Sequence, residues 1–362
     1  MTNILSLNLA GLEAACAELG WERYRARQLY SWLWQKGASD FDQMTNLARD
    51  KRNLLKERFT IALPAPVREL RDPDGTRKFT LELEDKLVVE AVYIPETGRR
   101  TVCVSTQVGC ALACAFCRTG QQGFKRNLAW HEIAGQVLAV KKRVQGTKGP
   151  RGQVQDSETL EPSNPRTLEP CPITNVVFMG MGEPFLNYDA TVEAATNLNL
   201  DYGLGIGARR ITISTSGIPE GIRRYADFPL QTKLAISLNA SDNETRDKLM
   251  PVNKLHPLEE LFAAIREYVA KKNKRVTFEY VLIDGMTNRR KDAYQLARLL
   301  KGIPCKVNLI PLNPVEGSVL RPPTGPAIEH FRDQLYPLLP AVTVRKSRGQ
   351  SILAACGQLA GS

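Results

Sequence analysis

The sequence predicts an α/β protein in which a parallel sheet or an open barrel follows a small helical domain. From about residue 128 onward strand-like and helix-like runs alternate, and residues 1–60 carry apolar side chains at helical spacing. With 362 residues, 43% of them hydrophobic, the chain is long and apolar enough to bury a substantial core. Functional side chains of such folds gather at the C-terminal ends of the strands, so we expect the site there.

The first sixty residues predict three helices. One apolar stripe ends at Gly20, a second stops near Gly37, and a third helix is expected over residues 47–59. Pro64 and Pro66 then interrupt the helical pattern. We therefore assign residues 1–64 to a helical domain, with stripes formed by Leu9, Leu12, Cys16 and Leu19 and by Leu29, Trp32 and Leu33.

Residues 65–95 are expected to form a short β extension or linker, before a main core over residues 96–345. Apolar residues alternate within 78–104 and predict two or three strands. The stretch from Gln145 to Pro172 is polar and contains Thr-Leu-Glu-Pro twice, which indicates a flexible surface insertion. Residues 346–362 form a C-terminal segment. The strands expected in the core are 175–179, 210–214, 233–238, 276–283, 306–310 and 341–345, and the clearest helices are 258–271 and 290–300.

The charge balance suits a polyanionic partner without proving one. The net charge is +11, and residues 266–301 contain ten basic and four acidic side chains. Nucleic acid is the simplest partner for such an excess, although charge alone favours a solvated basic surface helix. No run approaches the roughly 18 consecutive apolar residues of a membrane span, and no secretory signal is evident, so we expect a cytoplasmic protein.

Cysteine spacing carries the strongest chemical signal. Cys110, Cys114 and Cys117 form C-x3-C-x2-C, and three thiolates on a four-iron cluster leave one iron open for a substrate. Zinc is the alternative, with Cys103 as a fourth ligand, but structural zinc sites usually pair their cysteines in two separate C-x2-4-C units. Of the other cysteines, Cys16, Cys171 and Cys305 are interpreted as structural or inert.

Several other residues have an ordinary interpretation beside a functional one. Gly180-Met181-Gly182-Glu183 follows an expected strand, where glycines allow a ligand to approach, but a plain turn is the better interpretation of this run alone. Cys356 could be small packing in a terminal turn, Cys103 a buried strand residue, and Glu90 a solvated strand carboxylate. Arg345, Lys346 and Arg348 are candidate phosphate contacts or part of a solvated loop. His131, His256 and His330 show no metal or catalytic spacing.

The cysteine triplet, with Phe116 before the third cysteine, is the signature of the radical S-adenosylmethionine enzymes. Over nearly its whole length the chain resembles the RlmN family of 23S rRNA adenine C2-methyltransferases. This resemblance implies a partial (β/α)6 radical SAM barrel, with an N-terminal helical domain that binds RNA and a short β extension. It rests on the triplet together with Cys103–Cys110, Gln121-Gln122-Gly123-Phe124, Gly180-Met181-Gly182-Glu183-Pro184 and Ala354-Ala355-Cys356-Gly357-Gln358-Leu359.

The resemblance also implies the cofactors and the residues that bind them. The cofactors are one 4Fe–4S cluster, on Cys110, Cys114 and Cys117, and S-adenosylmethionine, two molecules of which are used per product. Asn239 departs from the family pattern, because many members carry His at this position. The implied cofactor contacts are Gly182, Glu183, Ser214, Ser237, Leu238, Asn239 and Asn313.

The implied mechanism passes through a methylated cysteine, because C2 of adenine cannot attack a methyl sulfonium directly. In enzymes like this one, a 5′-deoxyadenosyl radical takes hydrogen from a methyl group on Cys356, and the resulting radical adds to the base. Cys103 then resolves the protein–RNA crosslink by forming a transient disulfide with Cys356. Glu90 matches a proposed proton acceptor, a role for which Cys103 competes.

The implied partners are 23S rRNA, at adenine 2503, and also adenine 37 of some tRNAs. An electron donor such as flavodoxin or ferredoxin is expected, a membrane partner is not, and the enzyme should be a monomer. One alternative is C8 methylation of the same adenine, as in the sister family Cfr. Another, of a different class, is a zinc or iron–sulfur protein that binds RNA without catalysis.

Overall fold

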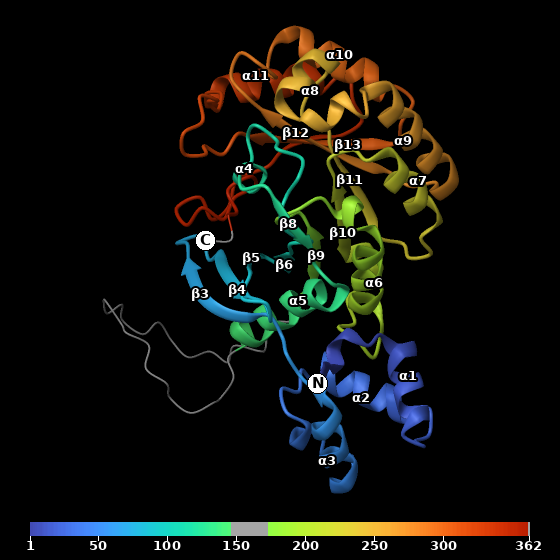
Figure 1. Cartoon of the computed structure of the whole chain (residues 1–362). Helices are drawn as coiled ribbons and strands as arrows, with labels where there is room; N and C mark the ends of the chain where they lie inside the picture. Colours follow the sequence, from blue (N-terminus) through green and yellow to red (C-terminus); the bar gives the residue numbers. More distant parts are fainter. Residues whose placement is uncertain (146–172, 361–362) are drawn as a thin grey trace, which may run out of the picture.

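A ten-stranded sheet organises the molecule in the computed structural model, which describes residues 1–145 and 173–360 (Figure 1). Its strand order is β14-β13-β12-β11-β10-β9-β6-β5-β4-β3. The strands from β6 to β14 run parallel, as their alternation with helices predicted. They are β6 (Arg99–Cys103), β9 (Asn175–Phe178), β10 (Ile211–Thr215), β11 (Lys233–Ser237), β12 (Val276–Leu282), β13 (Cys305–Pro311) and β14 (Val342–Val344).

Helices cover the convex face of the curved sheet (Figure 1). They supply the crossovers that parallel strands need, and they bury an apolar stripe against the sheet. Both helices predicted most clearly in the core are confirmed, as α9 and α10. The main crossover helices are α5 (Trp130–Gln145), α6 (Tyr188–Asn199), α7 (Pro219–Asp227), α8 (Asn243–Leu249), α9 (Leu258–Lys272), α10 (Arg290–Leu300) and α11 (Gly325–Leu335), with short 3-10 turns at η3 (Pro184–Asn187), η4 (Ala208–Arg210) and η5 (Pro251–Lys254).

The predicted β extension joins the same sheet. Strands β3 (Ala65–Arg71), β4 (Arg77–Glu82) and β5 (Val88–Glu96) are antiparallel and extend the sheet beyond β6. Their inward side chains, such as Phe79, Leu81 and Val89, are buried. The segment 345–360 then leaves β14 and reaches this opposite edge, where Ser351 bonds to Asp72. The C-terminal segment therefore spans the opening between the two ends of the sheet (Figure 1).

The helical N-terminal domain is confirmed and packs against the core. Its elements are β1 (Thr2–Asn3), η1 (Ile4–Ser6), α1 (Leu9–Glu18), α2 (Tyr24–Trp34), η2 (Phe41–Gln43), α3 (Arg49–Arg58) and β2 (Phe59–Thr60). The parallel pair β1–β2 was not predicted, because two-residue strands leave no pattern in the sequence. Trp34 lies 5.4 Å from Trp130 of α5 between ring centroids, and the Asn197 amide of α6 donates to the Tyr30 hydroxyl at 2.6 Å. These buried contacts join the domain to two core helices.

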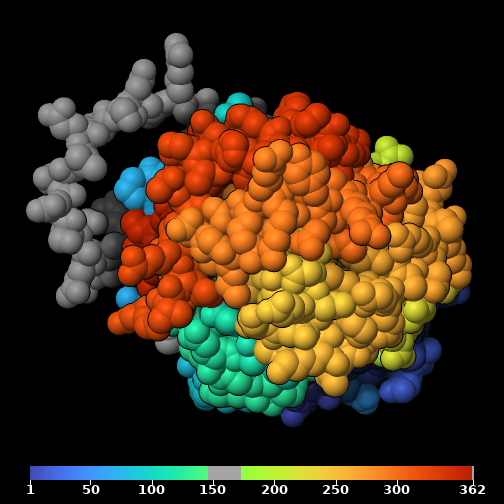
Figure 2. Space-filling model, turned by 90° about the horizontal axis from the view of Figure 1, so that it is seen from above, coloured from blue at the N-terminus to red at the C-terminus, as the bar shows by residue number. Residues whose placement is uncertain are grey.

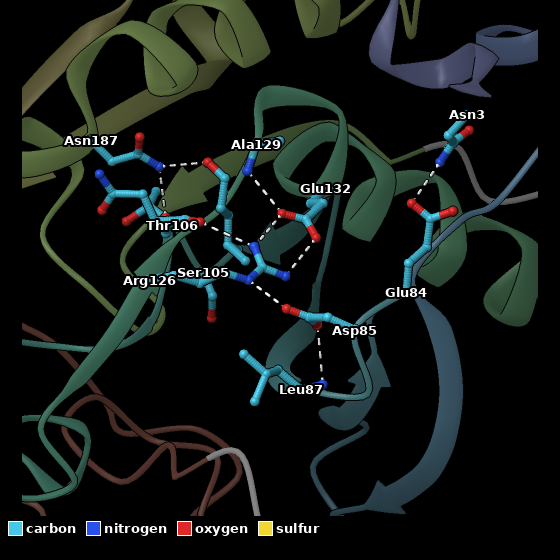
Figure 3. A network of polar contacts seen from close by, with 12 residues as sticks. Asn3, Glu84, Asp85, Leu87, Ser105, Thr106, Arg126, Ala129, Glu132 and Asn187 are labelled. Atoms are coloured by element: carbon cyan, nitrogen blue, oxygen red, sulfur yellow. Dashed lines mark hydrogen bonds and ion pairs between the residues drawn. The ribbon is translucent and has the colours of Figure 1, made fainter. Parts of the chain in front are cut away.

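A hairpin of β7 (Gln107–Gly109) and β8 (Phe124–Asn127) encloses the cysteine triplet and the short helix α4 (Arg118–Gln121). Arg126 anchors this hairpin by binding Glu132 through two hydrogen bonds and Asp85 through a third, as Figure 3 shows. Gly109 has φ +77°, and a Cβ there would lie 1.9 Å from the Gly123 carbonyl oxygen, so no other residue fits. The base of the hairpin is consequently fixed.

The inert cysteines and the polar insertion predicted from the sequence can now be placed in the fold. Cys16 and Cys305 are buried, as expected of structural cysteines. The insertion predicted for residues 145–172, with Cys171, lies outside the described residues except for Gln145, the last residue of α5. Among the described residues, no helix is both long and apolar enough to cross a bilayer.

Candidate active site

A cavity of about 160 Å³ lies at the C-terminal ends of the parallel strands, where the sequence placed the site. It is lined by residues that end or follow β9 to β13 and by all three cysteines of the triplet. Its walls are therefore built by loops from separate strands, as in other α/β sites. The predicted residues in this lining are Cys110, Cys114, Cys117, Gly182, Glu183, Ser214, Ser237, Asn239, Asn313 and Cys356.

The three cysteines of the triplet lie on one wall of this cavity. Cys114 is buried, whereas Cys110 and Cys117 are half-buried. Ala113 has φ 48°, an uncommon value for a residue with a side chain, and the Cys117 amide donates to the Cys114 carbonyl at 3.0 Å. This tight turn directs three thiols towards the same space. Burial raises the pKa of the Cys110 thiol to about 11, so an unliganded thiol there keeps its proton at neutral pH.

The three thiols can serve as ligands of a 4Fe–4S cluster. Each cysteine of such a cluster binds a different iron, whereas a zinc site needs all its thiolates about 2.3 Å from one centre. Among residues 1–145 and 173–360, no group of three His, Cys, Asp or Glu side chains that could hold a single metal ion is found. Three thiols on one cavity wall would supply ligands to three of the four irons and leave the fourth open towards the cavity.

The Gly180–Glu183 run forms a close-packed corner beside the cysteines. Gly182 has φ +94°, and a Cβ there would lie 2.5 Å from Gln107, which explains the glycine. The buried Glu183 carboxylate accepts hydrogen bonds from the Phe185 amide at 3.0 Å and the Ser216 amide at 2.6 Å. Burial raises the pKa of Glu183, while these hydrogen bonds oppose that shift. Glu183 is thus part of the wall and also joins the loops after β9 and β10.

The predicted residues after β10 and β11 do not all face the cavity. Ser214 and Ser237 line it, but Leu238 does not, because its side chain is fully buried in the core. Asn239 lines the cavity with φ 58°. Its side chain already accepts from the Val281 amide at 3.1 Å and donates to the Met250 sulfur at 3.3 Å. Leu238 can therefore offer a ligand only its backbone.

A second cavity of about 30 Å³ adjoins the first and contains Cys103. Cys356 lines both cavities, as do Asn313 and Arg345. Cys356 is exposed and Cys103 is buried. Burial is the main cause that raises the pKa of Cys103 to about 12; the Cys356 charge adds to the shift and the Arg345 charge opposes it. The structure thus brings together two cysteines that are far apart in the sequence, one of them facing the triplet as well.

The C-terminal segment that carries Cys356 is held by the loop after β13 and by the start of α4. The Asn313 amide donates to the Cys356 carbonyl at 3.1 Å, and the Arg118 amide donates to the Gly357 carbonyl at 2.7 Å. Gly357 has φ +86°, and a Cβ there would lie 2.8 Å from the Phe116 carbonyl oxygen. The cysteine's position therefore depends on contacts with the loop after β13 and with the triplet loop.

Glu90 lies apart from both cavities. Its carboxylate is 1% exposed, binds Lys78 at 3.1 Å and accepts from the Ala360 amide at 2.9 Å. The interpretation as a solvated strand carboxylate is therefore wrong, since the residue faces inward and holds the last described residue of the chain. The competing interpretation as a proton acceptor stays a prediction, because neither cavity lining includes this side chain.

The sequence analysis did not predict the positions of three charged residues at the site. Arg345 was interpreted as a phosphate contact or part of a solvated loop, yet it lines both cavities, whereas Lys346 is exposed. Glu279 is buried in the cavity wall, with one oxygen bonded to Asn308 and the other without a partner in the described chain. Arg246 is fully buried behind the wall. Charged residues within a strand or a polar helix gave no signal of such burial.

Comparisons with known proteins agree with this geometry. The ribosomal RNA large subunit methyltransferase N-terminal domain matches residues 2–61, and the radical SAM superfamily matches residues 166–297. The chain is 42% identical over 361 residues to a probable dual-specificity RNA methyltransferase RlmN of Syntrophomonas wolfei, with 98% of this chain and 96% of the relative covered. The chain belongs to the RlmN family. The crystal structure of a radical SAM methyltransferase from Sphaerobacter thermophilus, also 42% identical, matches this fold with a TM-score of 0.89 over 100% of both chains.

RlmN-family membership establishes the enzyme class and its cofactors. The protein is a radical SAM methyltransferase that uses a 4Fe–4S cluster and S-adenosylmethionine. The predicted barrel with its N-terminal domain is confirmed by the same structural match. The wall formed by the three cysteines suits the cluster, and the neighbouring strand-end loops suit the cofactor.

Proposed function

We propose that this protein methylates C2 of an adenine in RNA, at position 2503 of 23S rRNA and at adenine 37 of some tRNAs. The observation that carries the proposal is the position of Cys356, which lines the cavity of the cysteine triplet and also the small cavity of Cys103. The name of the RlmN relative, a probable dual-specificity RNA methyltransferase, supports two kinds of RNA substrate. When bound, the cluster and S-adenosylmethionine supply the methyl group and the radical chemistry.

Cys356 is the proposed methyl carrier, and Cys103 the residue that releases the product. Cys103 sulfur would attack Cys356 sulfur, the bond from Cys356 sulfur to the RNA-linked carbon would break, and the electron pair would pass to that carbon, which takes up a proton. An S–S bond would remain, and a dithiol reductant would reduce it before the next turnover. Arg345, which lines both cavities, would stabilise negative charge at either sulfur during this exchange.

The cofactor would be held by the strand-end loops. Cys110, Cys114 and Cys117 would bind the cluster, and Gly182, Glu183, Ser214, Ser237, Asn239 and Asn313 would surround S-adenosylmethionine in the cavity that they line. Leu238 would contribute only through its backbone. We assign Glu90 the task of fixing the C-terminal segment, and the role of proton acceptor to Cys103 in its thiolate form.

The remaining roles follow from the arrangement of the domains. The helical domain (1–64) would hold RNA, with the β extension (65–95) beside it, the core (96–345) generating the radical and the final segment (346–362) carrying the methyl group. Adenine in a loop or bulge can be turned out of its stack and enter the cavity. A low-potential donor such as flavodoxin or ferredoxin would supply electrons to a monomeric enzyme that works on RNA in the cytoplasm.

Mass spectrometry of the RNA product tests this function. Cluster-loaded protein, a chemical reductant and S-adenosylmethionine are incubated with fragments of 23S rRNA and tRNA, and the methylated nucleoside is compared with 2-methyladenosine and 8-methyladenosine standards. We expect 2-methyladenosine. The 8-methyl product would instead support the Cfr-like activity, and stoichiometric zinc without 5′-deoxyadenosine formation would support a non-catalytic RNA-binding protein.

A further inference from the structure

Arg246 is a fully buried arginine that forms no ion pair within the described chain; the acidic groups whose charges act on it are Cys114 and Asp247. It lies on α8, and all three guanidinium nitrogens donate: to the Leu238 carbonyl at 3.1 Å, to the Asn253 side-chain oxygen at 2.9 Å and to the Ser216 carbonyl at 2.5 Å. All three acceptors are neutral. Within the described chain, no carboxylate forms an ion pair with this arginine, whereas Arg289 on the neighbouring helix pairs with Asp292 at 2.8 Å.

The three contacts place Arg246 directly behind the cofactor loops. Ser216 follows β10, and Leu238 follows β11, so one planar guanidinium holds the backbone of two adjacent loops. Ser216 in turn donates its amide to Glu183, which lies on the loop after β9. The side chain therefore fixes part of the wall that faces S-adenosylmethionine without itself lining the cavity.

Helix α8 also contacts the cysteine loop. The Ala115 amide, next to Cys114, donates to the Leu249 carbonyl at 2.9 Å, one turn along α8 from Arg246. In Figure 2 the hairpin with the cysteines (teal) lies against the segment that contains α8 (yellow). Burial lowers the pKa of Arg246 to about 10, and the charges of nearby Cys114 and, to a smaller extent, Asp247 oppose that shift. Both observations place the guanidinium close to the proposed cluster ligand.

A buried charge without an ion-pair partner is costly, so something must offset it. Neutral carbonyl and amide oxygens solvate a guanidinium but do not cancel its charge. Three cysteine thiolates around a 4Fe–4S cluster carry a net negative charge, and they would lie on the far side of the same loop. A carboxylate partner would neutralise the arginine and remove its effect on the cluster.

We propose that Arg246 is a positioning residue that serves as the buried counter-charge of the cluster and also fixes the two cofactor loops. This inference rests on the placement of the cluster at Cys110, Cys114 and Cys117 proposed above. One-electron reduction adds a negative charge to the cluster, which a nearby cation stabilises. Arg246 therefore raises the reduction potential of the cluster and makes the electron transfer that precedes radical formation easier.

Two substitutions at Arg246 distinguish the effect of its charge from the effect of its hydrogen bonds to the loops. In cluster-loaded Arg246→Gln, we expect a midpoint potential more negative than that of the wild type, measured by redox titration followed by electron paramagnetic resonance. Arg246→Lys keeps the charge and should keep the potential, but it should bind S-adenosylmethionine about tenfold more weakly because two loop contacts are lost. The matched control is Lys248→Gln, which removes an exposed positive charge from the same helix and should change neither quantity.

A gentler variant keeps the test valid if Arg246→Gln does not fold. The double variant Asn253→Asp/Asp247→Asn leaves the arginine in place and moves a carboxylate to the position from which an amide oxygen now accepts its hydrogen bond at 2.9 Å. The second change is needed because the Asn253 amide donates to Asp247 at 2.7 Å, where two carboxylates would repel each other. We expect the cluster-free protein to gain thermal stability, the gain in Tm on cluster loading to shrink, and the potential to become more negative. Asn253→Ala, which adds no charge, serves as the control and should leave the potential unchanged.

Two results would overturn the counter-charge role. One is a potential unchanged in both Arg246→Gln and the double variant Asn253→Asp/Asp247→Asn. The other is an equal loss of Tm in the cluster-free and cluster-loaded forms of Arg246→Gln, which a merely structural residue would show. Failure of the proposed cluster site looks different. In that case Cys114→Ala would retain wild-type iron content, whatever happens at Arg246.

Discussion

The cysteine triplet and Cys356 face the same cavity but are held in different ways. The triplet lies in a hairpin whose base is closed by β7–β8 pairing and whose Gly109 allows no other residue. Cys356 lies in a C-terminal arm, residues 345–360, that has no helix or strand and is held by contacts from several separate elements, among them Asn313, Glu90 and Lys78. A cluster needs fixed geometry, whereas the proposed methyl carrier would have to meet two partners in turn. The wall is therefore fixed by strand pairing, and the arm by separate hydrogen bonds that can be removed one at a time.

Removing one cysteine from each region should abolish methyl transfer in both cases, but only the change in the triplet should also remove the cluster. Cys114→Ala should lose the cluster and all methyl transfer, because two thiolates cannot replace three. Cys356→Ala should retain wild-type iron content and still form 5′-deoxyadenosine, while methylation of RNA falls below detection. Iron analysis and product mass spectrometry measure both. Methylated adenine from Cys356→Ala would contradict the carrier role.

Cys103→Ala should prevent release of the RNA product without disturbing the cysteine triplet. The RNA should remain covalently attached to Cys356, because the sulfur that would displace it is missing. A band resistant to denaturation that contains both protein and RNA, with an intact cluster, is the expected result. Cys305→Ala, another buried cysteine outside both cavities, is the control and should turn over normally. A Cys103→Ala enzyme that releases product freely would refute the resolving role.

Glu90→Gln tests how the arm is anchored. The change leaves Lys78 buried without its partner, so we expect unfolding to become easier by about 3 kcal/mol. Residues 353–360 should also exchange amide hydrogens faster, since Lys78 and Glu90 bond to both ends of this stretch. The double variant Lys78→Met/Glu90→Gln should recover much of the stability. If it does so and yet makes no product, Glu90 is a proton acceptor rather than an anchor.

The two cysteines of the small cavity should differ in their dependence on pH. Cys103 has a pKa of about 12, so its alkylation by iodoacetamide should rise roughly tenfold per pH unit from pH 7 to pH 10, while exposed Cys356 reacts far faster. Because the folded protein binds this proton more tightly than the unfolded chain, stability should fall as pH rises from the ordinary thiol range towards 12. A Cys103 alkylation rate that levels off near pH 8 would contradict the shift; peptide mass spectrometry measures each site.

The smallest effect is expected at the outer end of the arm. Asp72→Ala removes two hydrogen bonds to Ser351, both exposed, and should lower stability by no more than about 1 kcal/mol. Methyl transfer should change less than threefold, because Asn313 still holds Cys356. Asp333→Ala, an exposed acid on α11, is the stability control. A large loss of activity in Asp72→Ala alone would show that this outer anchor positions the thiol.

Sequence patterns predicted the regular elements well and the loop contacts poorly. Alternation and helical spacing predicted the strands β9 to β14 and the helices α9 and α10, because these elements bury apolar stripes. Leu238 was expected to contact the cofactor but points into the core, and Glu90 was given a solvated face but is buried. Orientation within a loop or at a sheet edge depends on neighbours from distant segments, which spacing does not record.

By itself, the sequence determined the chemistry: three thiols at C-x3-C-x2-C, two further cysteines and strand-end glycines identify a radical SAM methyltransferase. Only the tertiary structure decided that Cys356 meets both the triplet and Cys103, since 253 residues separate the two cysteines of the small cavity along the chain. The tertiary structure also decided that Arg246 is fully buried, although it lies in the run Asn243–Leu249, which is polar except for its last residue. Local patterns fix which groups exist, whereas long-range packing fixes which of them lose water and face one another.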